Sequence, residues 1–146
     1  WFNNSTPDPK SIIASSLSDK SKQVINDVKY NLYNCKFSEA AESILSLAKD
    51  ANVYLNDNYP WKLIKDKENE ERVKNIIYNV LETSRIIGIL LLPILPNLSN
   101  EILDQLAYQY NPTIWEDDLK WGRLAKSSVL PKSQPVINKI DDTVEL

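Results

Sequence analysis

Apolar residues recur every three or four positions along much of this chain, and this spacing restricts the fold more than any other feature of the sequence. Such a spacing places side chains on one face of a helix, whereas a strand needs alternation. Every periodic segment of the 146 residues has the helical spacing. The sequence therefore predicts an all-α fold with little or no sheet.

Four segments carry this period, and we expect helices over residues 19–35, 38–56, 68–91 and about 99–110. Ser18 and Ser38 are expected N-caps, and acidic residues near position 70 suit the start of the third helix. The expected buried positions are Ile25, Val28, Leu32 and Cys35, then Ala41, Ile44, Ala48, Ala51 and Leu55, then Val73, Ile77, Val80, Ser84, Ile87 and Leu91, and finally Ile102, Leu106 and Tyr110.

Prolines interrupt the helical pattern at Pro60, Pro93 and Pro96, and no period continues beyond Asn111-Pro112. Short connections between long helices favour antiparallel neighbours, so we expect an up-and-down helical bundle with an extended C-terminal arm. The apolar run 86–95 has about half the length of a membrane span, so we expect it to form a buried helix end, with residues 86–92 covered on all sides.

Composition argues against several classes of function. A net charge of -3 disfavours a protein that binds nucleic acid by covering phosphates with cations. One cysteine and no histidine leave no disulfide framework, structural zinc site or histidine-based catalysis, so we expect no catalytic and no metal-binding residues. Glu116-Asp117-Asp118 is interpreted as a solvated face. A reducing, cytoplasmic location is expected.

The most informative local pattern is Pro60-Trp61, which follows the second predicted helix directly. A tryptophan on such a connection has two interpretations. It plugs the end of the bundle, or it offers a flat surface on which an unpaired RNA base stacks, because sequence-specific RNA recognition works mainly on single-stranded loops. The pattern alone leaves both open.

Several strings together resemble the anticodon-binding domain of the class I methionyl-tRNA synthetases. They are Phe37-Ser38-Glu39-Ala40-Ala41, Ala51-Asn52-Val53-Tyr54, Pro60-Trp61, Lys65-Asp66, Arg85 with the aliphatic run to Pro96, and the segment Asp118 to Leu124 with its Trp-Gly pair. In that family the tryptophan after the proline stacks on the first anticodon base, and the lysine four residues later lies near the anticodon. The resemblance thus implies an anticodon-binding site at Pro60, Trp61 and Lys65.

The same resemblance implies partners and a parent enzyme. The partners are tRNA with a CAU anticodon loop and the catalytic domain of the same chain, with no membrane. The parent is a methionine-tRNA ligase whose catalytic domain uses ATP and methionine, while this part catalyses nothing. Alternatives are the equivalent domain of another class I synthetase, such as that for valine, leucine, isoleucine or cysteine, and a helical protein-interaction module.

The family's site also uses an Asn and an Arg on a helix that opens with Gly-Asn-Leu, and Trp1-Phe2 aligns best with the residues just after that helix. We therefore expect residues 1–18 to be a linker remnant after a missing first helix. Residues 19–110 are expected to form the anticodon-binding bundle. Residues 111–146 are expected to form an arm that packs on the bundle or on the catalytic domain.

Overall fold

The computed structural model describes residues 1–13, 15–112 and 115–136, and these form helices joined by loops. The helices are α1 (Ser16–Tyr33), α2 (Phe37–Asn58), α3 (Pro60–Leu63), α4 (Glu70–Leu91), α5 (Pro96–Gln105) and α6 (Trp115–Asp118), with short 3-10 turns η1 (Phe2–Asn4) and η2 (Lys67–Asn69). Across these described residues the backbone forms no strand, only an isolated bridge between Ser5 and Val129. The all-α prediction is confirmed.

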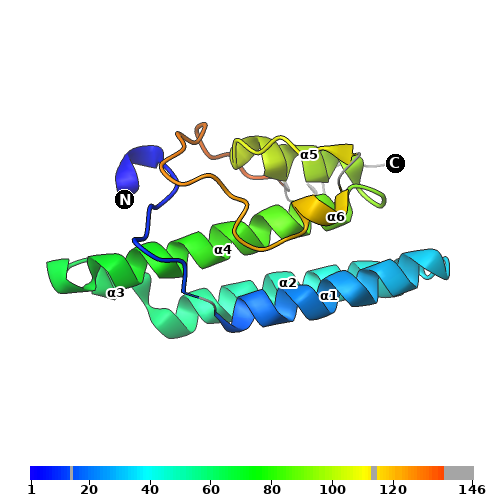
Figure 1. Cartoon of the computed structure of the whole chain (residues 1–146), viewed down its shortest axis with the longest axis horizontal. Coiled ribbons are helices and arrows are strands. Elements are labelled where there is room, and N and C mark those ends of the chain that lie inside the picture. The colour runs from blue at the N-terminus through cyan, green and yellow to red at the C-terminus, as the bar shows by residue number, and fades with distance from the viewer. Residues whose placement is uncertain (14, 113–114, 137–146) are drawn as a thin grey trace, which may run out of the picture.

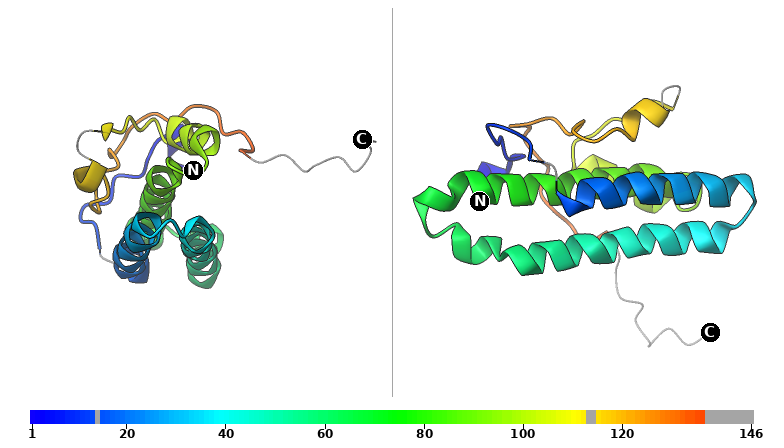
Figure 2. Two further views of the ribbon diagram at one scale, coloured as in Figure 1. Left: turned by 90° about the vertical axis from the view of Figure 1, so that its right-hand side faces the viewer. Right: turned by 60° about the horizontal axis from the view of Figure 1, so that its bottom comes forward.

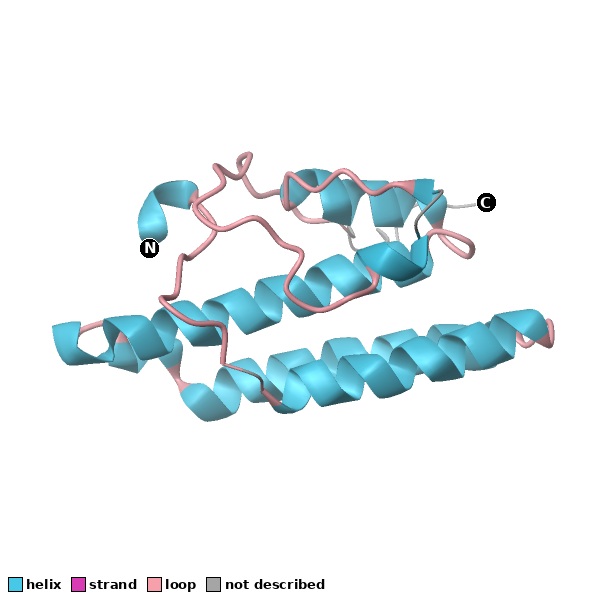
Figure 3. Cartoon of the chain, viewed as in Figure 1, coloured by secondary structure: helices cyan, strands magenta, loops and turns pink. Residues whose placement is uncertain are grey.

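Helix α4 is the centre of the molecule. The hairpin of α1 and α2 covers one side of it, and α5 runs antiparallel to it on the other side (Figure 1, Figure 2). The arm after α6 returns along α4 as extended chain, which the loop colouring of Figure 3 makes visible. The predicted up-and-down bundle with an extended arm is therefore correct.

The buried face of α4 differs from the predicted one. Ile76, Ile86 and Leu90 are buried, whereas the predicted Ile77 and Ile87 are only partly buried. Because neighbours cover α4 on two sides, most of its positions are buried. Val73 and Leu91 are buried as predicted, whereas the middle of the predicted stripe, Ile77 to Ile87, lies along a less covered edge. The expected burial of the apolar run holds for Ile86, Ile89, Leu90 and Leu91, which are all buried.

Glycine and serine let α5 approach α4 closely. A Cβ atom at Gly88 would lie 2.9 Å from Leu103 Cδ2, and Ser99 Oγ donates a hydrogen bond of 2.6 Å to the carbonyl of Gly88. Helix α5 begins at Pro96 rather than near Ser99. Proline suits the first turn of a helix because its missing N–H would have no intrahelical partner there.

Both predicted serine caps were wrong. Ser18 lies inside α1 and is buried, and α2 begins at Phe37 after Lys36, with no capping bond from a side chain. Cys35 is exposed rather than buried, because the chain leaves α1 there in a left-handed conformation with φ 57°. The apolar stripe ends at Leu32, one turn earlier than predicted.

The arm is tied to the centre of α4. Leu119 and Leu124 are buried, and the hydroxyl of Tyr78 donates a 2.8 Å hydrogen bond to the carbonyl of Leu124. Burial raises the pKa of Tyr78 to about 12, so this donor keeps its proton at neutral pH. No described helix has the length and apolar character that crossing a membrane requires.

Candidate nucleic-acid interface

A sharp corner between α2 and α3 presents the candidate residues at one end of the bundle. Tyr59 takes a left-handed conformation with φ 46°, which stops α2, and Pro60 then occupies the first turn of α3. Pro60 is buried, so the corner is anchored in the bundle. Trp61, the next residue, is carried on the outside of this corner.

Trp61 and Tyr59 form an exposed aromatic pair. Their rings meet edge to face, with centroids 5.8 Å apart and planes at 82°, and the side chains are 41% and 47% exposed. The ammonium of Lys62 lies 4.5 Å from the centroid of the Tyr59 ring. The tyrosine fixes the direction of the indole, while part of the indole surface stays open to a ligand. Tyr59 was missed by sequence reasoning, although it directly precedes the Pro-Trp pair.

Lys65 lies in the turn that follows α3 and is exposed. Its neighbour Asp66 stabilises this turn, since the carboxylate accepts a 3.1 Å hydrogen bond from the backbone N–H of Glu68. Among the described residues no acidic group forms an ion pair with Lys65. The structure thus holds Pro60, Trp61 and Lys65 on a single six-residue segment at the end of the bundle.

The N-terminal turn η1 adds a further aromatic residue to this end. Trp1 and Phe2 enclose, with Ile64, Lys67 and their neighbours, a hollow of about 230 Å³. Trp1 is 59% exposed. Because about sixty positions separate the N-terminal turn from α3, no local pattern in the sequence indicates that the two segments lie at the same end of the molecule (Figure 1).

The acidic segment at α6 is not a uniform solvated face as predicted. Glu116 pairs with Lys29 at 2.8 Å and Asp117 pairs with Lys120, and these hydrogen bonds lower the pKa of both carboxyls. Asp118 is buried and accepts a 3.0 Å hydrogen bond from the hydroxyl of Tyr108. Within the described ranges no group of three potential metal ligands comes together.

The fold and this end of the molecule define an all-α bundle with exposed aromatic side chains at a helix corner. Residues 10–145 match the family model described as the anticodon binding domain of methionyl tRNA ligase. The chain belongs to this family. The match favours the methionyl-tRNA ligase family over the two alternatives, which were another class I synthetase and a general protein-interaction module.

Relatives and solved structures agree with this assignment. The chain is 35% identical over 115 residues to a methionine–tRNA ligase of Synechocystis, covering 72% of the chain and 21% of that protein. It is 30% identical over 148 residues to one of Caldanaerobacter subterraneus, covering 100% of the chain and 23% of that protein. It therefore spans under a quarter of these relatives.

The fold is similar to that of the Mycobacterium tuberculosis methionyl-tRNA synthetase in its free state, with a TM-score of 0.83 and 24% identity. The superposition covers 94% of this chain and 28% of the other. At this identity the likeness bears on the fold alone.

Proposed function

We propose that this chain recognises the CAU anticodon loop of tRNA for a methionine-tRNA ligase. Trp61 stacks on the first anticodon base, Pro60 holds the corner that presents it, and Lys65 lies near the RNA backbone. The bundle of residues 19–110 carries this site, and residues 111–146 form the arm. The observation that carries the proposal is the exposed indole of Trp61, held edge-on by Tyr59 at the end of a bundle of this family.

The charge of the chain supports recognition by local contacts. With a net charge of -3, the protein gains little from general attraction to phosphates. Stacking is independent of net charge because every base has an aromatic face. Lys62 places a cation over the Tyr59 ring, and Lys65 adds an exposed cation four residues after Trp61. Both strengthen binding to one loop without making the whole surface basic.

The proposal extends to the parent enzyme. The catalytic domain outside this chain activates methionine with ATP, and the described helices contribute no reacting group. The proposed partners of this chain are the tRNA and that catalytic domain. The proposed location is the cytoplasm, in keeping with a chain that has one cysteine.

The test is Trp61→Ala in the intact ligase. Loss of one stacking contact should lower kcat/KM for charging the CAU tRNA by roughly 5- to 150-fold. Exchange of pyrophosphate into ATP with methionine should be unchanged, because adenylate formation needs no tRNA. Trp61→Phe should recover part of the loss by keeping a ring.

The matched control is Tyr33→Ala, which removes an 89% exposed aromatic residue at the last position of α1. The connection from α1 to α2 lies at the opposite end of the bundle from α3 (Figure 1). This variant should charge tRNA normally. A parallel fall of charging and pyrophosphate exchange in Trp61→Ala, or a large loss of its thermal stability, would mean that Trp61 is a structural plug.

A further inference from the structure

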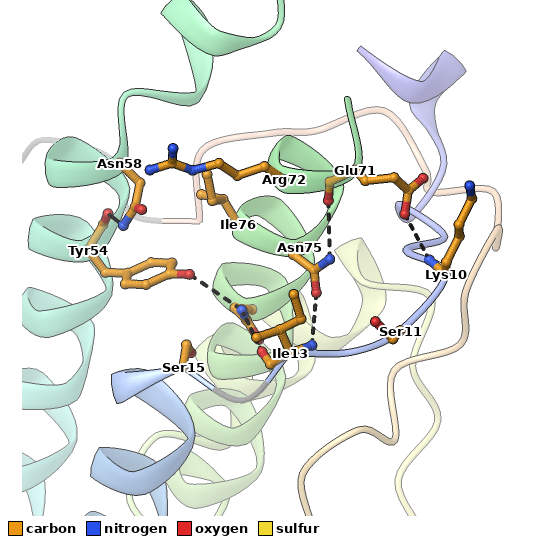
Figure 4. A pocket seen from close by; sticks show the side chains of 11 residues that line it. Lys10, Ser11, Ile13, Ser15, Tyr54, Asn58, Glu71, Arg72, Asn75 and Ile76 are labelled. Atoms are coloured by element: carbon orange, nitrogen blue, oxygen red, sulfur yellow. Dashed lines mark hydrogen bonds between the residues drawn. The ribbon is translucent and has the colours of Figure 1, made fainter. Parts of the chain in front are cut away.

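A cavity of about 440 Å³ opens beside the α2–α3 corner, and the proposed contacts of Trp61 leave it unused. It lies between the last turns of α2, the first turns of α4 and the N-terminal residues Lys10, Ser11, Ile13 and Ser15 (Figure 4). We call it the Tyr54 cavity. Its volume falls within the range of about 300–1,000 Å³ that is usual for sites of small ligands.

Two flat side chains enter the cavity from opposite helices. The ring of Tyr54 extends from α2 toward α4, and the side chain of Arg72 extends from α4 toward Asn58 on α2 (Figure 4). Unpaired bases stack on aromatic rings and on guanidinium planes. The cavity therefore presents both kinds of stacking surface that unpaired bases use.

Two buried polar atoms of residues that line the Tyr54 cavity have no hydrogen-bond partner among the described residues. Asn79 is 2% exposed, and its Oδ1 has no hydrogen-bond partner in the described part of the chain. The Oγ of Ser15, which also lines the cavity, is buried and unpaired in the same way. Unpaired buried acceptors are costly, so this site favours a ligand that brings a donor. Among the three bases of the proposed CAU anticodon, cytosine and adenine carry such a donor as an exocyclic amine, whereas uracil has only a ring N–H.

The existing bonds of Asn79 are long enough to be exchanged at small cost. Its Nδ2 donates to the carbonyl of Ile13 and to the hydroxyl of Tyr54, both at 3.4 Å. Such distances exceed the usual 2.7–3.2 Å, so these bonds hold the amide weakly. Binding of a base requires the Asn79 amide to turn from these weak contacts, so that its carbonyl oxygen accepts a hydrogen bond from the base amine.

The charges at the rim favour a phosphate. Arg72 is exposed and forms no ion pair with any other described residue. The nearby carboxylate of Glu71 is already engaged, since it accepts a 3.0 Å hydrogen bond from the backbone N–H of Lys10 and pairs with Lys74 at 2.9 Å. The cation of Arg72 is thus left for a ligand, and Lys10 supplies a second positive charge on the same rim.

The cavity is within reach of a strand bound at Trp61. Asn58 lines the cavity and precedes Trp61 by three residues, which limits the separation of their Cα atoms to about 11 Å. We propose that the Tyr54 cavity binds one unstacked adenine or cytosine nucleotide of the RNA strand that stacks on Trp61. The base lies between Tyr54 and Arg72, its amine faces Asn79, and its phosphate contacts Arg72. This inference rests on the proposed function.

The test measures binding of a CAU anticodon hairpin, and of versions with one abasic loop position each, to the intact ligase. In the wild type, two abasic positions should each weaken binding by roughly 5- to 150-fold. Tyr54→Leu should abolish the sensitivity at one position, and Trp61→Ala should abolish it at the other. Arg72→Gln should lower the slope of log K against log salt by about 0.7, the value for one phosphate contact on a single strand.

Lys49→Gln is the matched control, because Lys49 is an exposed cation on α2 outside the cavity. It should leave both the abasic pattern and the salt slope unchanged. If Tyr54→Leu lowers the helical content, the salt slope of Arg72→Gln becomes the deciding measurement, because replacing the exposed Arg72 side chain should not disturb the fold. An unchanged salt slope in Arg72→Gln would overturn the inference.

The remaining outcomes separate this inference from the proposed function. One outcome is that an abasic position weakens binding in a way that Trp61→Ala abolishes, while neither Tyr54→Leu nor Arg72→Gln changes the abasic pattern or the salt slope. That outcome would overturn the cavity assignment alone. Insensitivity of the wild type to every abasic position would overturn both. Photolabelling of the Tyr54 peptide by free 8-azido-AMP, but not by an azido-adenine hairpin, would overturn the RNA assignment and identify a free-nucleotide site.

Discussion

At the residue scale, a buried ion pair connects the centre of α4 to the arm. Arg85 and Glu82 are both fully buried and share two hydrogen bonds, of 2.7 and 3.0 Å. The guanidinium also donates to the carbonyls of Asp118 and Lys120, and the carboxylate accepts the backbone N–H groups of residues 122–124. Because every polar atom of the two side chains has a hydrogen-bond partner, the pair tolerates burial. Its hydrogen bonds also hold the turn at Trp121-Gly122 in place.

Replacing Arg85 by Met should lower the free energy of unfolding by about 3–5 kcal/mol, because the Glu82 carboxylate would stay buried without its cation. Urea denaturation measures the change. Lys74→Met is the comparison, since Lys74 pairs with Glu70 and Glu71 near the surface, where such pairs contribute about 0–1 kcal/mol. Equal losses in the two variants would show that burial gives the Arg85 pair no special weight.

At the element scale, the sequence predicted the four longer helices but not α3 and α6, and it predicted their buried faces only in part. The repeat of apolar residues is a local feature of the sequence, and the segments that carry it form α1, α2 and α4. The buried face of α4 depends on α5 and the arm, which come later in the chain, so the local apolar repeat predicts burial of Ile77 and does not indicate that of Ile76. The candidate site shows the same division, since Pro60-Trp61 is a local pattern while the Tyr54 cavity needs three distant segments.

Two adjacent isoleucines of α4 test this packing. Ile76 is 2% exposed and Ile77 is only partly buried. Ile76→Ala should therefore lower the free energy of unfolding by about 2–5 kcal/mol, the usual cost of emptying a core site, and Ile77→Ala by clearly less. Chemical denaturation of both variants compares the same deletion on the same helix. A larger loss of stability in Ile77→Ala than in Ile76→Ala would mean that α4 buries the face predicted from the sequence.

At the scale of the whole molecule, the first residues and the arm hold each other in place. The N–H of Thr6 donates to the carbonyl of Ser128 at 2.8 Å, and the N–H of Leu130 donates to the carbonyl of Asn4 at 2.9 Å. The hydroxyl of Thr6 donates a further 2.6 Å bond to the carbonyl of Ala125. Residues far apart in the sequence are thus joined above α4, on the side away from the α1–α2 hairpin (Figure 1).

This arrangement predicts where the chain tolerates shortening. Ending it after Pro131 keeps these bonds and the contacts of Glu82, and removes only the Gln105–Gln134 hydrogen bonds from the described structure, so the urea midpoint should hardly change. Ending it after Lys120 removes Leu124 from the core and three donors from the buried Glu82 carboxylate. Loss of Leu124 alone should cost about 2–5 kcal/mol, a large part of the 5–15 kcal/mol that stabilises a typical domain. The shorter chain should unfold at much lower urea, and equal midpoints for the two would mean that the arm lies on the bundle without stabilising it.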